Sequence, residues 1–201
     1  KAAIFLVSGG TQSNLLVMAH LLRPHEAVIS AETGHIYANE TGAIEATGHR
    51  IIPIASGDGK LTVDAIAAVL ANFHLRPHVV KPRLVYISNA TEIGSHYDKD
   101  ALEKLYAYCQ SQQLLLFMDG ARLGNALMAK DNNLTLADVA RNTDVFYIGG
   151  TKNGALLGEA IIFSNAHLAD DFDYSLKQRG ALLAKGRLLG VQFVELFKNG
   201  L

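Results

Sequence analysis

The chain has 201 residues, with 18 Lys or Arg and 19 Asp or Glu, so its formal net charge is −1. This balance argues against a nucleic-acid surface or a polybasic membrane anchor, and no apolar run reaches the ~18 residues that a membrane span needs. With 49% hydrophobic residues and one cysteine, Cys109, the composition predicts a single domain without an internal disulfide, as is typical of a cytoplasmic protein.

Short apolar runs alternate with helical patterns, which indicates βαβ units and a parallel sheet. In chain order, the predicted strands cover residues 2–7, 27–30, 51–54, 84–88, 114–118, 145–148 and 160–163. The predicted helices cover residues 12–22, 35–46, 62–73, 98–112, 134–140, 166–172 and 180–197, with Thr62 and Asp98 as caps. We therefore expect an α/β fold, a three-layer αβα sandwich around a mostly parallel sheet of about seven strands.

The two ends of the chain suggest a longer protein. The sequence does not begin with Met, and residues 2–7 already read as a buried strand. It stops just after an apolar helical pattern at residues 188–197. We expect residues 1–201 to form one domain of a longer chain, with flanking segments missing on both sides.

A glycine-rich segment, residues 8–14 (SGGTQSN), lies between the first predicted strand and the first helix. Glycines let the backbone approach an anion, and free amides at a helix N-terminus bind phosphate, to which the hydroxyl of Thr11 can add a donor. A plain turn with a Ser or Thr cap explains the segment equally well. The segment matches neither the dinucleotide fingerprint nor the P-loop.

A carboxylate, Asp119, directly follows the apolar strand at residues 114–118. Burying a carboxylate is costly unless it is paired or hydrogen-bonded. Asp119 is therefore a candidate to hold a protonated ring nitrogen, although it could equally cap a helix over residues 121–127. Arg122 follows three residues later and could pair with Asp119 or reach a ligand anion.

A lysine, Lys152, follows the strand at residues 145–148. Desolvation and nearby cations leave a lysine neutral and able to attack a carbonyl, whereas a solvated surface lysine is the plain alternative. Three glycines, Gly149, Gly150 and Gly154, are expected to clear space around its side chain.

A histidine, His35, has Glu40 five residues after it. Its imidazole could stack on a flat ring or act as a base near neutral pH, or it could simply be hydrogen-bonded near a helix start. The remaining histidines and Cys109 lack metal-ligand spacing, so we expect no metal site.

The four groups are expected to meet at one edge of the sheet, because ligands of open α/β sheets lie beyond the carboxyl ends of the strands. A phosphate cradle, a ring stacker, an aspartate for a ring nitrogen and a lysine that forms a Schiff base are together what pyridoxal phosphate (PLP) requires. The alternative is a non-catalytic module for a phosphorylated ligand, which leaves Lys152 and Asp119 unexplained.

On these segments, including Met118-Asp119-Gly120-Ala121-Arg122-Leu123 and Thr151-Lys152, the chain resembles the PLP-dependent threonine aldolase and β-eliminating lyase family of fold type I. The resemblance implies the large domain of an enzyme that cleaves a β-hydroxy-α-amino acid to glycine and an aldehyde. β-Elimination and transamination remain alternatives. It also implies that a C-terminal small domain is absent, a small amino-acid substrate, and a homodimer or homotetramer.

The resemblance also implies a role for each residue. Gly10, Thr11 and Gln12 would hold the phosphate. His35 would stack on the pyridine ring, and Asp119 would pair with the ring nitrogen. Arg122 would lie beside the phenolic oxygen or the substrate carboxylate, and Lys152 would form the Schiff base. Lys152, His35 and Asp119 would be catalytic, with His35, or a water held by it or by the phosphate, as the base. The chain departs from the family pattern at Asn153-Gly154-Ala155, and a later family arginine has no certain counterpart among Arg179, Lys185 and Arg187.

Overall fold

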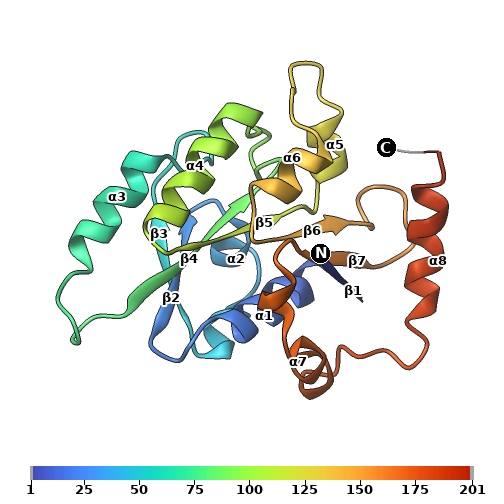
Figure 1. Ribbon diagram of the computed structural model, residues 1–201, viewed down its shortest axis with the longest axis horizontal. Helices are drawn as coiled ribbons and strands as arrows, with labels where there is room; N and C mark the ends of the chain where they lie inside the picture. The colour runs from blue at the N-terminus through green and yellow to red at the C-terminus, as the bar shows by residue number, and fades with distance from the viewer. Residues whose placement is uncertain (1, 200–201) are drawn as a thin grey trace.

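The computed structural model describes residues 2–199 (Figure 1). Seven strands of this part of the chain form one sheet: β1 (Ala3–Val7), β2 (Glu26–Ala31), β3 (Arg50–Ile54), β4 (Lys81–Ser88), β5 (Leu115–Asp119), β6 (Val145–Gly149) and β7 (Glu159–Phe163). The helices are α1 (Gly10–Leu21), α2 (His35–Ala38), α3 (Val63–Asn72), α4 (Lys99–Ser111), α5 (Leu123–Leu127), α6 (Leu136–Arg141), α7 (Phe172–Gln178) and α8 (Arg187–Leu196). Short 3-10 turns lie at η1 (Glu45–Thr47) and η2 (Ala166–Ala169).

The strand order is β1-β7-β6-β5-β4-β2-β3. From β3 to β6 every neighbouring pair is parallel, whereas β7 runs antiparallel to both β1 and β6. The carboxyl ends of six strands and the amino end of β7 therefore lie at one edge of the sheet. The predicted seven-stranded, mostly parallel sheet is confirmed.

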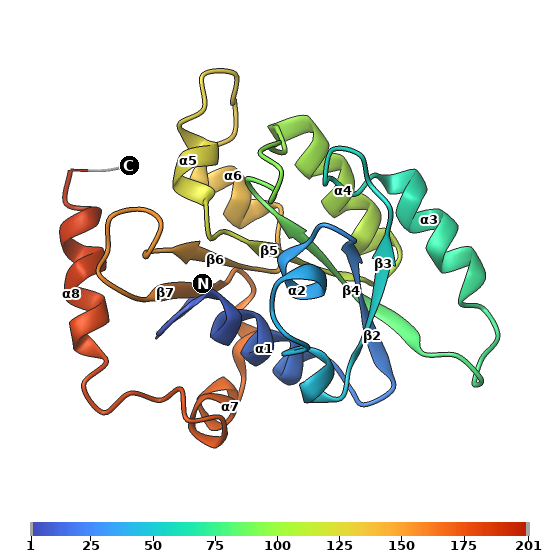
Figure 2. The ribbon, with the colours of Figure 1, turned by 180° about the vertical axis from the view of Figure 1, so that it is seen from behind.

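Helices cover both faces of the sheet, which makes three layers (Figures 1 and 2). One core lies beneath α1, α2 and α7, and the other lies beneath α3, α4, α5 and α6. Alternate residues of β5 serve the two cores: Leu115 and Phe117 face the first, Leu116 and Met118 the second. The same alternation directs the side chain of Asp119 toward the α1 and α2 layer.

Two predicted helix starts are confirmed by their caps. The Thr62 hydroxyl accepts from the Ala65 N–H at 3.2 Å, and the Asp98 carboxylate accepts from the Ala101 N–H at 2.8 Å. Both bonds satisfy an N–H that has no partner inside its own helix. Cys109 is buried in the core, as predicted from its place on the apolar face of α4.

Three predicted helices are wrong in extent. The helix predicted at residues 35–46 ends at Ala38, and Thr41 and Gly42 then adopt positive φ angles of 54° and 72°. The helix predicted at 166–172 is only a 3-10 turn, because Asp171 has a φ of 63°. The one predicted at 180–197 begins at Arg187, after an irregular stretch. A residue with positive φ cannot continue a right-handed helix.

The first predicted strand is present, but the expectation that it is buried is wrong. β1 is an edge strand paired only with β7, and Ile4 on it is 64% exposed. Edge strands are protected on one side only, so an apolar run is not by itself proof of burial.

No helix within residues 2–199 is long and apolar enough to cross a membrane. No group of three or more His, Cys, Asp or Glu side chains in the same range is arranged to hold a metal ion.

Candidate active site

A cavity of about 120 Å³ opens at the carboxyl edge of the sheet, and its lining comes from residues at or near the ends of six strands. Six of the predicted site residues line it: Gly10, Thr11, His35, Asp119, Arg122 and Lys152. Segments up to about 140 residues apart in the chain are thus brought to one place. A larger hollow of about 360 Å³ lies between α5 and α8, but its lining contains no titratable side chain.

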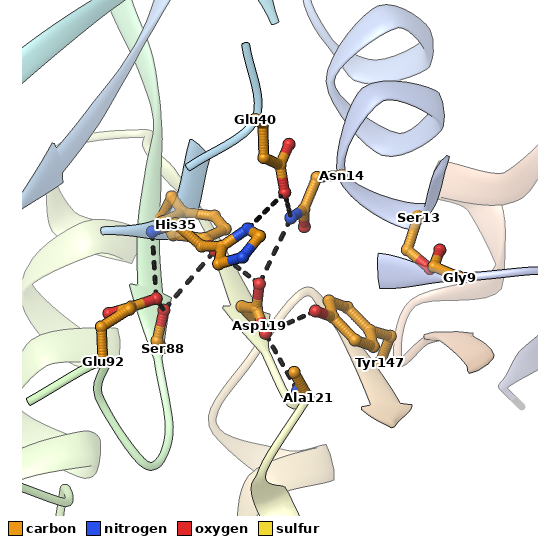
Figure 3. Close-up of polar contacts among 11 residues, drawn as sticks. Gly9, Ser13, Asn14, His35, Glu40, Ser88, Glu92, Asp119, Ala121 and Tyr147 are labelled. Carbon is orange, nitrogen blue, oxygen red and sulfur yellow. Dashed lines mark hydrogen bonds and ion pairs between the residues drawn. The ribbon is translucent and has the colours of Figure 1, made fainter. Parts of the chain in front are cut away.

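Asp119 is the buried centre of the site, with only 4% of its surface exposed (Figure 3). One carboxylate oxygen accepts from the Tyr147 hydroxyl at 2.5 Å and the Ala121 N–H at 2.9 Å. The other accepts from the Tyr86 hydroxyl at 2.5 Å and the Asn14 amide at 3.2 Å. Burial raises the pKa of both tyrosines well above the usual value, so both remain protonated and donate. Asp119 caps no helix, since α5 begins only at Leu123.

His35 is the first residue of α2, and its ring is held from one side (Figure 3). Its Nδ1 lies 2.8 Å from Oε1 of the buried Glu40, and the Asn14 amide donates to that same oxygen at 2.7 Å. The hydrogen bond to Glu40 raises the pKa of His35, while burial opposes the rise. With Nδ1–H donated to the carboxylate, a neutral His35 has its unprotonated nitrogen at Nε2.

A second carboxylate, Glu92, links His35 to the end of β4. Its Oε1 accepts from the His35 backbone N–H at 3.0 Å and from the Ser88 hydroxyl at 2.7 Å (Figure 3). Glu92 thereby satisfies an N–H at the start of α2, where Gly34 provides no side-chain cap. Glu92 also lines the cavity.

Lys152 and Arg122 are the cations of the cavity. Lys152 is an exposed residue in the turn that follows β6, and Arg122 is half-buried in the turn between β5 and α5. Within residues 2–199, neither side chain has a carboxylate within ion-pair distance. Both are therefore available to a ligand.

Two of the three glycines expected to clear space for Lys152, Gly149 and Gly150, instead make room for backbone. A Cβ at Gly149 would lie 2.5 Å from the Ala121 carbonyl oxygen. A Cβ at Gly150 would lie 2.3 Å from the Gly158 carbonyl oxygen. These close approaches let β6 and the Lys152 turn pack against their neighbours.

The glycine-rich segment forms the start of α1. Gly10 is the first residue of the helix, and a Cβ there would come within 2.9 Å of the Tyr147 hydroxyl oxygen. Thr11 is exposed at the mouth of the cavity. The Gln12 side chain is not in the cavity lining; its amide oxygen accepts from the backbone N–H and the hydroxyl of Ser8 at 3.0 and 2.9 Å.

Five residues of the site were missed by sequence reasoning: Asn14, Tyr86, Glu92, Tyr147 and Glu159. The two tyrosines read as ordinary core residues of apolar strands. Glu92 and Glu159 lie close to strand ends, and that position is the one signal that could have found them. Asn14 is buried inside a helix, where an amide normally needs polar partners.

The model of the beta-eliminating lyase family matches residues 1–195. The chain belongs to this family. It is 39% identical over 199 residues to a low-specificity L-threonine aldolase of a Pseudomonas species, covering 98% of this chain and 57% of the relative. A second relative of the same description, from Pseudomonas aeruginosa, is 37% identical over 198 residues, again 98% of this chain and 57% of the relative.

A solved threonine aldolase structure from Leishmania major superimposes with a TM-score of 0.97 at 51% identity, covering 99% of this chain and 58% of that one. An archaeal alanine:glyoxylate aminotransferase shares the fold, with a TM-score of 0.75 at 19% identity, covering 98% of this chain and 48% of that one. The chain spans a little under three fifths of the length of these threonine aldolases.

Proposed function

We propose that the protein is a PLP-dependent aldolase that cleaves a threonine-like β-hydroxy-α-amino acid to glycine and an aldehyde. The observation that carries the proposal is the cavity in which Asp119, His35 and Lys152 meet at one edge of the sheet. The likeness to threonine aldolases over 98% of the chain supports the choice of reaction within the family.

The cavity residues fit PLP. Four hydrogen-bond donors face the Asp119 carboxylate, so both of its oxygens act as acceptors, as a partner of a ring N–H must. Two buried oxygens, Oδ1 of Asn14 and Oε2 of Glu40, have no hydrogen-bond partner within residues 2–199. Both belong to the buried network that joins Glu40 to Asp119, behind the residues that line the cavity.

We assign the cofactor contacts as follows. The backbone amides of Gly10, Thr11 and Gln12 at the start of α1 would bind the phosphate, and His35 would lie against the ring. Asp119 would hold the ring nitrogen, Arg122 would lie beside the phenolic oxygen or the substrate carboxylate, and Lys152 would anchor the cofactor covalently. When bound, PLP supplies the electron sink that stabilises the carbanion left by cleavage of the Cα–Cβ bond.

The protein's own contribution to the reaction is proton transfer and orientation. His35 would accept the proton of the substrate β-hydroxyl at Nε2, because its Nδ1–H is bound to Glu40. Asn14 ties Glu40 to Asp119, so the base and the ring-nitrogen partner are held in one network. A fixed spacing between these groups is what a single substrate orientation requires.

The identity of the products tests the proposal. The full-length protein, loaded with PLP, is expected to convert L-threonine to acetaldehyde and glycine in equal amounts. Lys104→Ala, on α4 and outside the cavity lining, is the matched control and should behave as the parent. Ammonia and a keto acid as the only products would instead identify a β-eliminating lyase, and the absence of any turnover or cofactor binding would favour a non-catalytic phosphate-binding module.

We propose further that the protein works in the cytoplasm on a small-molecule amino acid as a homodimer or homotetramer, as its family resemblance implies. The mass of the PLP-loaded full-length protein in solution, measured by light scattering, tests the assembly. A mass of one protomer would contradict it.

A further inference from the structure

The turn that carries Lys152 is held at its base by a buried carboxylate, Glu159. Glu159 is the first residue of β7 and is 3% exposed. Its Oε2 accepts from the Gly150 backbone N–H at 2.7 Å, and its Oε1 accepts from the Thr151 hydroxyl at 3.1 Å. Both oxygens thus bind the two residues that directly precede Lys152.

Other contacts fix the rest of this turn but do not reach Thr151. The Asn153 amide donates to the carbonyl oxygens of Gly149 and Ala121 at 2.7 and 3.2 Å. The Gly150 N–H also donates to the Gly158 carbonyl oxygen at 3.0 Å, which closes the loop between β6 and β7. Glu159 therefore makes the contact that immobilises the side chain next to the lysine.

The burial of the Glu159 carboxylate costs free energy of folding, which calls for a functional reason. No Lys, Arg or His lies within ion-pair distance of its carboxylate in residues 2–199, and burial raises its pKa, while the bonds from Gly150 and Thr151 and the charge of Lys152 oppose the rise. A glutamine of the same shape would avoid the cost of burying a charge. Buried carboxylates beside a reactive group are candidates for a functional role.

We infer that Glu159 is the positioning residue for Lys152: it holds the Gly150 N–H and the Thr151 hydroxyl so that the lysine amine projects into the cavity, and it adds a negative charge to the lining of the same cavity. The inference rests on the proposed function, since it presumes that Lys152 binds PLP. The titratable and charged groups that line the cavity together with Lys152 and Glu159 are His35, Glu92, Asp119, Arg122 and Tyr147.

The first test is Glu159→Gln in the full-length protein loaded with PLP. Glutamine keeps the size and one acceptor but removes the charge, so the protonated form of the lysine-bound chromophore loses stabilisation. The pH at which the visible absorbance changes is expected to fall by on the order of one unit. Glu103→Gln, an exposed carboxylate on α4, is the matched control and should titrate as the parent does.

A second pair of variants tests position apart from charge, and it decides the matter if Glu159→Gln does not fold. Thr151→Val removes the hydroxyl that Glu159 binds, and Thr151→Ser keeps it. Thr151→Val is expected to lower kcat by about tenfold with KM little changed, because the amine is held less firmly, and Thr151→Ser to restore the parent value.

Two results would overturn the inference. One is a folded Glu159→Gln protein whose chromophore titrates at the parent pH; the other is a Thr151→Val protein with the parent kcat. Failure of the proposed function itself looks different, since the parent protein would then show neither a visible chromophore nor aldehyde formation.

Discussion

Asp119 is the residue on which the site depends most. Each of its two oxygens accepts two hydrogen bonds, and the donors come from β4, β6, α1 and its own turn. This one side chain therefore joins the end of β5 to three other elements. It does so within a cavity that also contains Lys152 and Arg122.

Asp119→Asn is expected to keep the fold and lose the activity. An amide nitrogen in place of one oxygen would face two donors, which costs about 1–3 kcal/mol of unfolding free energy. Loss of the proposed charge partner of the PLP ring nitrogen is expected to lower kcat/KM by about a hundredfold or more. Urea unfolding and aldehyde release measure the two effects. Asp131→Asn, on a side chain that is 81% exposed, is the control and should change neither.

Glu40→Gln is expected to move the pH dependence of the reaction. Glu40 raises the pKa of His35, so His35, the proposed base, loses its proton only at a higher pH. Without that charge the pKa of His35 falls, and the acid limb of kcat/KM should move to lower pH by on the order of one unit. Glu45→Gln, on an exposed carboxylate nearby, should leave the limb in place. An unmoved limb in Glu40→Gln would exclude His35 as the group that titrates.

At the scale of residues, the sequence predicted the site residues that come soon after a strand and whose type suits phosphate binding, ring contact or covalent attachment. Gly10, His35, Asp119 and Lys152 have these properties, and all of them line the cavity. Tyr86 and Tyr147 could not be predicted, because they lie within apolar strands and reach Asp119 only after β4, β5 and β6 pair. Hydrogen-bond partners that meet through strand pairing leave no local pattern.

At the scale of elements, close backbone contacts hold the turn after β5 against the end of β6. A Cβ at Gly120 would lie 1.8 Å from the Tyr147 carbonyl oxygen, so the turn after β5 can pass β6 only with glycine there. The Gly149 N–H donates to the Gly120 carbonyl oxygen at 2.9 Å across the same contact. The position of Asp119 and that of the Lys152 turn are thereby coupled.

Gly120→Ala is therefore expected to destabilise the protein strongly. A methyl group cannot fit without separating β5 from β6, at a cost of about 3 kcal/mol, the upper end of the usual range for overpacking. Gly57→Ala, where the added Cβ meets nothing within 4 Å, is the matched control and should remain within about 0.5 kcal/mol of the parent. Urea unfolding of the two variants checks this, and equal stabilities would contradict the packing described for this contact.

The elements themselves were predicted with uneven success for physical reasons. Helices that begin at a side-chain cap, such as α3 and α4, were placed correctly because the cap is a local signal. The helix predicted at residues 35–46 was wrong because its apolar spacing continues past Thr41 and Gly42, whose positive φ angles interrupt the backbone. Periodicity reports which side chains are apolar, not whether the backbone between them is continuous.

At the scale of the whole molecule, the strand order assembles the site. The hydrogen bond from Asn14 to Asp119 joins residues 105 positions apart, and the antiparallel β7 brings its first residue, Glu159, to the same edge as the carboxyl ends of its neighbours. The parallel sheet was predicted from alternating strands and helices, but the reversal of β7 was not, since a strand's direction is invisible in its composition.

We propose that this cavity binds PLP through Lys152. The most direct measurement is borohydride reduction of the PLP-loaded full-length protein, followed by peptide mass mapping. The reduced cofactor is expected on Lys152, and Lys152→Ala is expected to show no visible band and no turnover of threonine. A label on any other lysine, or a Lys152→Ala protein with normal turnover, would contradict this proposal.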